Sequence, residues 1–159
     1  MNLALDALAV EVSGQLAAGG VRALVLKGPS LTGWLYGEGS TRFSRDVDLL
    51  VDPEAFEQAE RLLEGRGLQP QVPWREDRTA RHWRREDSAF EIDLHRTLVG
   101  VGVSPQDAWE TLSGRTEPLD VAGGSVEVLD PAARALVLAL HAAKHQSVRG
   151  QPLDDLERG

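Results

Sequence analysis

The spacing of hydrophobic positions changes twice in the first part of the chain. Between residues 2 and 18 the apolar residues recur mostly three or four positions apart, which predicts a helix that ends at a pair of glycines. Residues 21–26 are then a nearly continuous apolar run, typical of a buried strand. Helical spacing returns behind Pro29, a residue favoured at the first position of a helix. We therefore expect a helix, a strand and a second helix in this order.

Later segments alternate between the two periods. Where every second residue is apolar we expect a strand, and where apolar residues recur three or four apart we expect a helix. The strands expected are residues 45–51, 89–95 and 125–129, with 68–74 extended and with 81–85 as a strand joined to 89–95 by a polar turn. The helices begin near 52, 104 and 132 and end near 64, 112 and 146. This mixture predicts an α/β (α+β) domain in which helices flank a mixed β-sheet, with a C-terminal helix that has little left to pack against.

The strand expected at 45–51 carries two acids on one face. Because strand side chains alternate, Asp46 and Asp48 point the same way. The other side, with Val47, Leu49 and Val51, can face a core. Two acids on a buried edge repel each other and are costly to desolvate, so a cation between them would stabilise the pair. Metal binding is one interpretation. For an Asp-x-Asp taken alone, two solvated acids at an exposed strand end are the more common outcome.

A later strand adds a third carboxylate. On the strand expected at 89–95, Asp93 points away from the apolar side. If the two acidic strands are neighbours in one sheet, Asp93 meets Asp46 and Asp48. Three carboxylates form the oxygen ligation that suits Mg²⁺. Such a cluster can hold two ions that stabilise the attacking and leaving oxygens of a displacement at phosphorus.

The turn after the first expected strand suits an anion. Gly28 permits close backbone approach, and the helix that begins at Pro29 presents backbone N–H groups at its N-terminus. Lys27 is either a phosphate ligand or a strand-end residue that extends into solvent, and the pattern does not separate the two. The polar loop that follows brings Arg42 and Arg45 next to the acidic strand.

Composition narrows the classes of function. At 159 residues the chain has the length of one domain, and its formal net charge of −8 argues against binding bulk nucleic acid through a basic surface. The absence of cysteine excludes disulfides, thiolate nucleophiles and cysteine zinc sites. The acidic N-terminus and the lack of a long apolar run argue against a signal peptide and a membrane span, so we expect a cytoplasmic protein.

Taken together, these motifs resemble the DNA polymerase beta-like nucleotidyltransferase superfamily. Its pattern is an apolar strand, a glycine turn, Asp-x-Asp and a later strand with a third Asp. Those places are held here by Leu26-Lys27-Gly28-Pro29-Ser30, Arg45-Asp46-Val47-Asp48-Leu49-Leu50-Val51 and Glu91-Ile92-Asp93-Leu94-His95. The closest resemblance is to uncharacterised bacterial nucleotidyltransferase-like proteins, some of which accompany peptide natural-product gene clusters. It covers residues 20–97 well and the terminal helix loosely, and Pro29 stands where the superfamily has Gly or Ser.

The resemblance implies a nucleotidyltransferase core over residues 1–130 and a C-terminal helical segment over 131–159. The alternative for this segment is that it is a truncated part of a longer helical region. Asp46 and Asp48 would ligate two Mg²⁺ ions, for which Mn²⁺ could substitute. Asp93 would ligate the catalytic ion and accept the proton of an acceptor hydroxyl.

The same resemblance implies how substrates bind. Gly28 and Ser30 would contact the β- and γ-phosphates of an NTP, most readily ATP, and Lys27, Arg42 and Arg45 would hold phosphate oxygens. A small molecule, a peptide or a protein hydroxyl would attack the α-phosphorus, and pyrophosphate would leave. The alternative is a catalytically silent nucleotide-binding or protein-interaction module, antitoxin-like or accessory to peptide maturation, that acts on a partner protein. The three acids favour the enzyme, whereas the proline after the glycine turn and the short C-terminal region favour the silent module.

Other polar and aromatic residues have competing interpretations. His95 lies two residues from Asp93 on the same expected face, so it either orients the site or, slightly more commonly, is a surface histidine. His141 and His145 lie four apart on a helix with no glutamate between them, which favours an ordinary helix surface over a zinc site. Trp83 is expected in the core.

Overall fold

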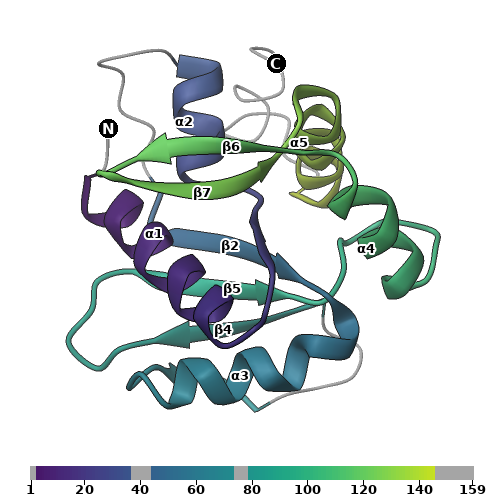
Figure 1. Cartoon of the computed structure of the whole chain (residues 1–159). Coiled ribbons are helices and arrows are strands. Elements are labelled where there is room, and N and C mark those ends of the chain that lie inside the picture. The colour runs from purple at the N-terminus through teal and green to yellow at the C-terminus, as the bar shows by residue number, and fades with distance from the viewer. Residues whose placement is uncertain (1–2, 37–43, 74–78, 146–159) are drawn as a thin grey trace.

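The computed structural model describes residues 3–36, 44–73 and 79–145, and it consists of a mixed seven-stranded sheet with helices on both faces (Figure 1). The helices are α1 (Leu3–Ala18), α2 (Pro29–Tyr36), α3 (Phe56–Glu64), α4 (Pro105–Ser113) and α5 (Pro131–His145), and a 3-10 turn (Pro53–Ala55) precedes α3. The strands are β1 (Ala23–Val25), β2 (Asp46–Val51), β3 (Gln69–Pro70), β4 (Ala80–Arg84), β5 (Glu91–His95), β6 (Thr116–Val121) and β7 (Gly124–Leu129). The α/β class expected from the hydrophobic pattern is confirmed.

The sheet order β3-β4-β5-β2-β1-β7-β6 places the two acidic strands side by side. Strand β2 runs parallel to β5, and the register sets Asp48 directly opposite Asp93. On its other side β2 pairs antiparallel with β1, so the turn that follows β1 lies beside the acidic end of β2. The expected adjacency of the two acidic strands is therefore confirmed.

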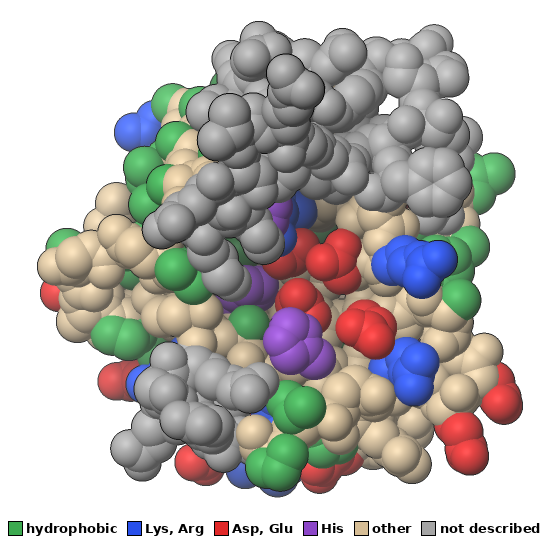
Figure 2. Space-filling view, turned by 180° about the vertical axis from the view of Figure 1, so that it is seen from behind, with side chains coloured by type: hydrophobic (Ala, Val, Ile, Leu, Met, Phe, Trp, Pro, Cys, Tyr) green, Lys and Arg blue, Asp and Glu red, His purple; other side chains and the backbone are tan. Residues whose placement is uncertain are grey.

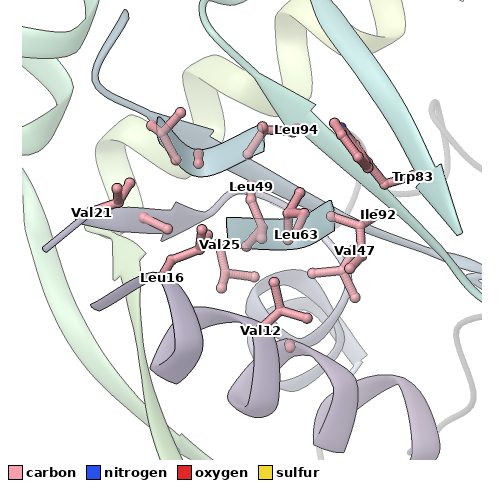
Figure 3. Packing of buried hydrophobic residues seen from close by; sticks show 14 of the residues in the cluster. Val12, Leu16, Val21, Val25, Val47, Leu49, Leu63, Trp83, Ile92 and Leu94 are labelled. Atoms are coloured by element: carbon pink, nitrogen blue, oxygen red, sulfur yellow. The ribbon is translucent and has the colours of Figure 1, made fainter. Parts of the chain in front are cut away.

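Each face of the sheet packs on its own hydrophobic core. Helices α1 and α3 cover one face, where Val47 and Leu49 of β2 meet side chains such as Val12 and Leu63 (Figure 3). On the other face Leu50 belongs to a second cluster, built with residues of α4 and α5. Because strand side chains alternate, the acids of β2 lie on this second face together with Leu50.

Strand β6 is not predicted by the sequence pattern. Pro118 lies in its middle, and a proline lacks the N–H that a strand flanked on both sides would need. The strand forms because it is at the edge of the sheet, where it pairs with β7 alone. An edge strand can accept a proline where the backbone nitrogen points away from its single neighbour, because no N–H is needed there.

Two other expectations change. The last helix does have a partner, because Ala133 and Val137 of α5 are buried in the second core. The first strand is shorter than residues 21–26 and spans Ala23–Val25.

The expected core position of Trp83 is confirmed, since its side chain is fully buried. Of the helices that the structure describes, none has both the length and the apolar character of a membrane span.

Candidate functional site

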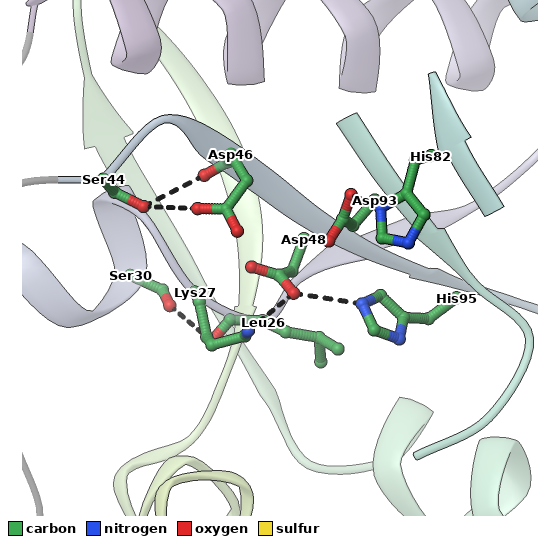
Figure 4. A network of polar contacts seen from close by, with 9 residues as sticks. All are labelled: Leu26, Lys27, Ser30, Ser44, Asp46, Asp48, His82, Asp93 and His95. Atoms are coloured by element: carbon green, nitrogen blue, oxygen red, sulfur yellow. Dashed lines mark hydrogen bonds and ion pairs between the residues drawn. The ribbon is translucent and has the colours of Figure 1, made fainter. Parts of the chain in front are cut away.

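Asp48 is at the centre of a polar network on the second face of the sheet (Figure 4). Its residue is only 1% exposed, so the carboxylate needs partners inside the protein. The ammonium nitrogen of Lys27 lies 2.7 Å from Oδ1 of Asp48, and Nε2 of His95 lies 3.0 Å from the same oxygen. Both partners come from strands or strand ends that flank β2, so the sheet itself brings the three side chains together.

The balance of these contacts keeps Asp48 ionised. Burial would raise the pKa of its carboxyl, but the hydrogen bond from His95 and the charge of Lys27 outweigh burial and hold the pKa well below its ordinary value. Asp48 is therefore a buried carboxylate with a stable negative charge.

Asp93 has the opposite tendency. Burial and the neighbouring charge of Asp48 raise its pKa, and the charge and hydrogen bond of His82 offset this only in part. Nδ1 of His82 lies 2.5 Å from Oδ1 of Asp93, across the β4–β5 pair where the two residues face each other. The pKa values of two carboxylates on adjacent strands are thus shifted in opposite directions.

Two overlapping groups of side chains can hold a metal ion. One ligand atom each from Asp48, Asp93 and His95 lie within 4.8 Å of one another, and the same is true of His82, Glu91 and Asp93. Asp93 belongs to both groups, so the site can extend to either side of it. Seen from behind, acidic side chains and histidines gather in one area of the molecular surface (Figure 2).

Asp46 lies on the same face of β2 but one step away from these groups. It is opposite Glu91 in the strand register, and its Oδ1 accepts a hydrogen bond of 2.7 Å from Oγ of Ser44. Among the described residues it is not in either group of ligand atoms. Of the three aspartates, the structure therefore brings Asp48 and Asp93 together, and Asp46 lies beside them.

The turn after β1 has the expected backbone conformation, and the hydroxyl of its serine is hydrogen-bonded within the protein. Gly28 has a φ of +72°, the left-handed conformation that glycine adopts at least cost, and α2 begins at the next residue. Ser30 is 1% exposed, and its Oγ donates a 2.8 Å hydrogen bond to the carbonyl of Leu26. The Ser30 hydroxyl is thus hydrogen-bonded within the turn, and the expected contact of Ser30 with a phosphate stays a prediction.

The basic residues expected at the site are distributed differently from one another. The side chain of Lys27 is largely buried, and its ammonium forms an ion pair with Asp48. Arg45 is exposed directly before β2, whereas Arg42 lies outside the described residues.

Two histidines make more contacts with the acids than the sequence pattern predicts. His95, interpreted as slightly more often a surface residue, contacts Asp48, and His82 was not singled out although it contacts Asp93. The signal for His82 was the register of the expected hairpin, which sets it opposite Asp93. That register depends on turn geometry and could not be fixed from the spacing of apolar residues.

The sequence profile of the uncharacterised nucleotidyltransferase family matches residues 1–156. The chain belongs to this family. Membership of a nucleotidyltransferase family makes the protein a transferase, and the resemblance inferred from the sequence motifs is confirmed. No curated protein sequence matches the chain.

Solved structures of other nucleotidyltransferases have a similar fold. The lincomycin-bound lincosamide antibiotic adenylyltransferase LnuA is 15% identical with a TM-score of 0.61, over 93% of this chain and 91% of that one. The antibiotic-resistance factor ANT(2'')-Ia is 16% identical with a TM-score of 0.67, over 99% and 82%. An antigenic nucleotidyltransferase-like protein from Paracoccidioides brasiliensis is 17% identical with a TM-score of 0.64, over 97% and 74%. At these identities the likeness shows the fold of this family member and not its substrate.

Proposed function

We propose that the protein transfers a nucleotidyl group from an NTP, first of all ATP, to a hydroxyl acceptor in a Mg²⁺-dependent reaction. The observation that carries this proposal is the pair Asp48 and Asp93, a buried and a half-buried carboxylate held opposite each other on neighbouring strands. A buried pair of like charges destabilises a protein unless a cation or a proton compensates it. A site for chemistry at phosphorus needs this concentration of negative charge to hold its metal ions.

The side chains fit Mg²⁺. Asp48 and Asp93 supply carboxylate oxygens, the ligands that Mg²⁺ prefers, and Asp46 adds a third carboxylate one step along β2. When bound, Mg²⁺, or Mn²⁺ in its place, supplies positive charge for the attacking and leaving oxygens. His95, a nitrogen donor, suits a role in orienting Asp48 better than one as a ligand of this ion.

Lys27 and the turn at Gly28 are the proposed binding groups for the nucleotide phosphates. Lys27 is next to the Gly28 turn, so its ammonium can contact either Asp48 or an anion that binds at the turn. We propose that the phosphates of the nucleotide draw Lys27 away from Asp48, which leaves that carboxylate open to the metal ion. Arg45, exposed beside the acids, and Arg42 are proposed to hold outer phosphate oxygens in bidentate fashion.

Asp93 is the proposed general base. A raised pKa makes a carboxylate a better proton acceptor, and His82 fixes the direction of the Asp93 side chain through a 2.5 Å contact. The acceptor hydroxyl gives its proton to Asp93, and its oxygen forms a bond to the α-phosphorus. The bond from the α-phosphorus to the bridging oxygen breaks, and pyrophosphate leaves with the electron pair.

For the acceptor we propose a small hydroxylated molecule before a peptide or a protein. LnuA and ANT(2'')-Ia, which share the fold, are described as an antibiotic adenylyltransferase and an antibiotic-resistance factor. The negative net charge of the chain makes bulk nucleic acid the least favoured acceptor.

Calorimetric titration of ATP, GTP, CTP and UTP into the protein, once with MgCl₂ and once with EDTA, tests this proposal. We expect Mg²⁺-dependent binding that Asp48→Asn removes and that Asp120→Asn, an exposed control on β6, preserves. Slow Mg²⁺-dependent release of AMP from α-labelled ATP, with water as acceptor, should be lost in Asp93→Asn. Nucleotide binding without release of AMP, and without formation of an AMP ester from any of a broad panel of alcohols, would favour the silent module. Absence of nucleotide binding would refute the proposal.

A further inference from the structure

A pocket opens beside the acids, between the end of β5 and helix α5. Its walls are aliphatic and come from the segment after β5 and from α5, and its floor is next to the polar network of Asp48. It is a small pocket of about 50 Å³ that is open to solvent on one side. It is lined chiefly by Leu98, Val99, Val137 and Leu140, with Lys27 and His95 on the side of the acids. A pocket with apolar walls and a few convergent polar groups is the usual form of a small-molecule site.

His95 connects this pocket to the acids. Its Nε2 contacts Asp48, and its Nδ1 is buried without a hydrogen-bond partner among the residues that the structure describes. Figure 4 shows this second nitrogen turned away from Asp48. A buried ring nitrogen without a partner costs free energy, and a ligand that hydrogen-bonds to it would recover that cost.

We infer that this pocket binds the acceptor, and the inference rests on the proposed nucleotidyl transfer. The leaving pyrophosphate must face the Gly28 turn, where the phosphates bind. Because displacement at phosphorus is in line, the acceptor approaches from the opposite side, which is the side of β5 with Asp93 and His95. The pocket is lined by His95 on this side and by Lys27 on the side of the turn, and both side chains contact Asp48, so a hydroxyl bound in the pocket would lie next to the acids.

The lining also indicates the class of acceptor. Its walls are aliphatic, and the polar groups that line it are a lysine and histidines, with no carboxylate among the described lining residues. Ammonium groups would find no counter-charge in it and would be repelled by Lys27. The pocket therefore selects a neutral alcohol with an apolar ring or chain, and it disfavours polycationic acceptors.

Benzyl alcohol is a suitable probe because it joins one apolar ring to one hydroxyl. Saturation-transfer NMR measures its binding to the whole chain in the presence of Mg²⁺ and α,β-methylene-ATP, which cannot release pyrophosphate. In Leu140→Trp the indole fills the pocket from α5, whereas Leu136→Trp on the same helix is a matched control, since Leu136 is 50% exposed and does not line the pocket. Val99→Phe fills the pocket from the opposite wall and replaces Leu140→Trp if that variant does not fold.

We expect the filling variants to weaken benzyl alcohol binding at least about fivefold, roughly 1 kcal/mol, while the ATP affinity measured by calorimetry changes less than twofold. With ATP itself, wild type and Leu136→Trp should form the benzyl ester of AMP, detected by mass spectrometry, and the filling variants should not. Loss of ATP binding in the filling variants would overturn the inference by assigning the pocket to the nucleobase. Failure of wild type to bind benzyl alcohol while it binds ATP would also overturn it, and failure of wild type to bind any NTP would instead refute the proposed function.

Discussion

The ammonium of Lys27 and the carboxylate of Asp48 form an ion pair of 2.7 Å in which both side chains are largely buried, 14% and 2% exposed. Burial is unfavourable for each charge alone, and each compensates the other. The pair also places a cation of the protein itself on the carboxylate proposed to bind metal. The protein without substrate thus has an internal substitute for the missing charge, and loading the site requires an exchange of partners for Asp48.

Replacing Lys27 by Met should reveal how much Asp48 depends on this cation. The single variant leaves a buried carboxylate with His95 alone, and we expect the free energy of unfolding in EDTA to fall by about 3 kcal/mol. Adding Asp48→Asn to Lys27→Met should recover most of this loss, because the uncompensated charge is gone. Urea denaturation of the four proteins of this cycle measures the coupling. A single variant within about 0.5 kcal/mol of wild type would show that the pair contributes little to stability.

Metal binding should depend on the same exchange. A ligand that binds only the folded state stabilises it, by about 2.7 kcal/mol at a hundred times its Kd. We expect Mg²⁺ to raise the melting temperature of Lys27→Met more than that of wild type, because the ion meets no competing ammonium on Asp48. Melting curves with and without EDTA measure this, and Asp48→Asn should lose the response. An equal Mg²⁺ response in wild type and Lys27→Met would argue that Lys27 does not compete for the site.

Asp93→Asn should stabilise the protein in the absence of metal. The amide of this variant would keep an oxygen that accepts the hydrogen bond from His82, but it would remove a charge that burial and Asp48 disfavour. At pH 7 in EDTA we expect a melting temperature a few degrees higher than that of wild type. The exposed control Asp120→Asn should change it little.

The pH dependence follows from the direction of the shift. The pKa of Asp93 is raised in the folded state, so protonation of this carboxyl favours folding. The stability that this group contributes is fully present below its unfolded pKa. It is lost as pH rises through its folded pKa. The advantage of Asp93→Asn over wild type should therefore shrink as pH falls from 7 toward about 4. Melting curves across this range measure it. An advantage that grows on acidification would contradict the raised pKa.

How far the sequence predicts this site depends on the range of each interaction. Alternation within one strand is local, so the shared face of Asp46 and Asp48 could be derived from spacing. The contact of His82 with Asp93 depends on the register of a hairpin, and that of Lys27 with Asp48 on the pairing of β1 with β2. Register is set by turns and by the whole core, which the local pattern does not contain.

The fold shows the same division. The helices follow from the hydrophobic period, because each buries one face, and β1 follows from its continuous apolar run, because it is buried on both faces. Strand β6 does not, since its proline and two acids resemble a loop and only pairing with β7 makes it a strand. The place of Ser30 in the motif likewise does not give its side-chain rotamer, which in the folded turn directs the hydroxyl to the carbonyl of Leu26.

Gly28→Ala tests the turn itself, and the chain offers a matched control in Gly67→Ala. Both glycines have a positive φ, +72° and +79°, so an alanine at either place is strained by about 1 kcal/mol. A Cβ at Gly28 would lie 3.5 Å from the carbonyl oxygen of Asp46, an ordinary contact, and a Cβ at Gly67 would meet nothing within 4 Å. Backbone strain is thus the shared cost, and overpacking is not expected in either variant.

The two variants should differ in nucleotide binding. Gly67 follows α3, which covers the face of the sheet opposite the acids, whereas Gly28 is in the turn proposed to receive the phosphates. We expect similar losses in the free energy of unfolding, measured with urea, but a Mg²⁺-dependent ATP affinity at least about tenfold weaker in Gly28→Ala alone. The added methyl group prevents the close approach of a phosphate to the backbone N–H groups of the turn. Unchanged ATP affinity in Gly28→Ala would exclude this turn as the phosphate site and shift attention to the exposed guanidinium of Arg45.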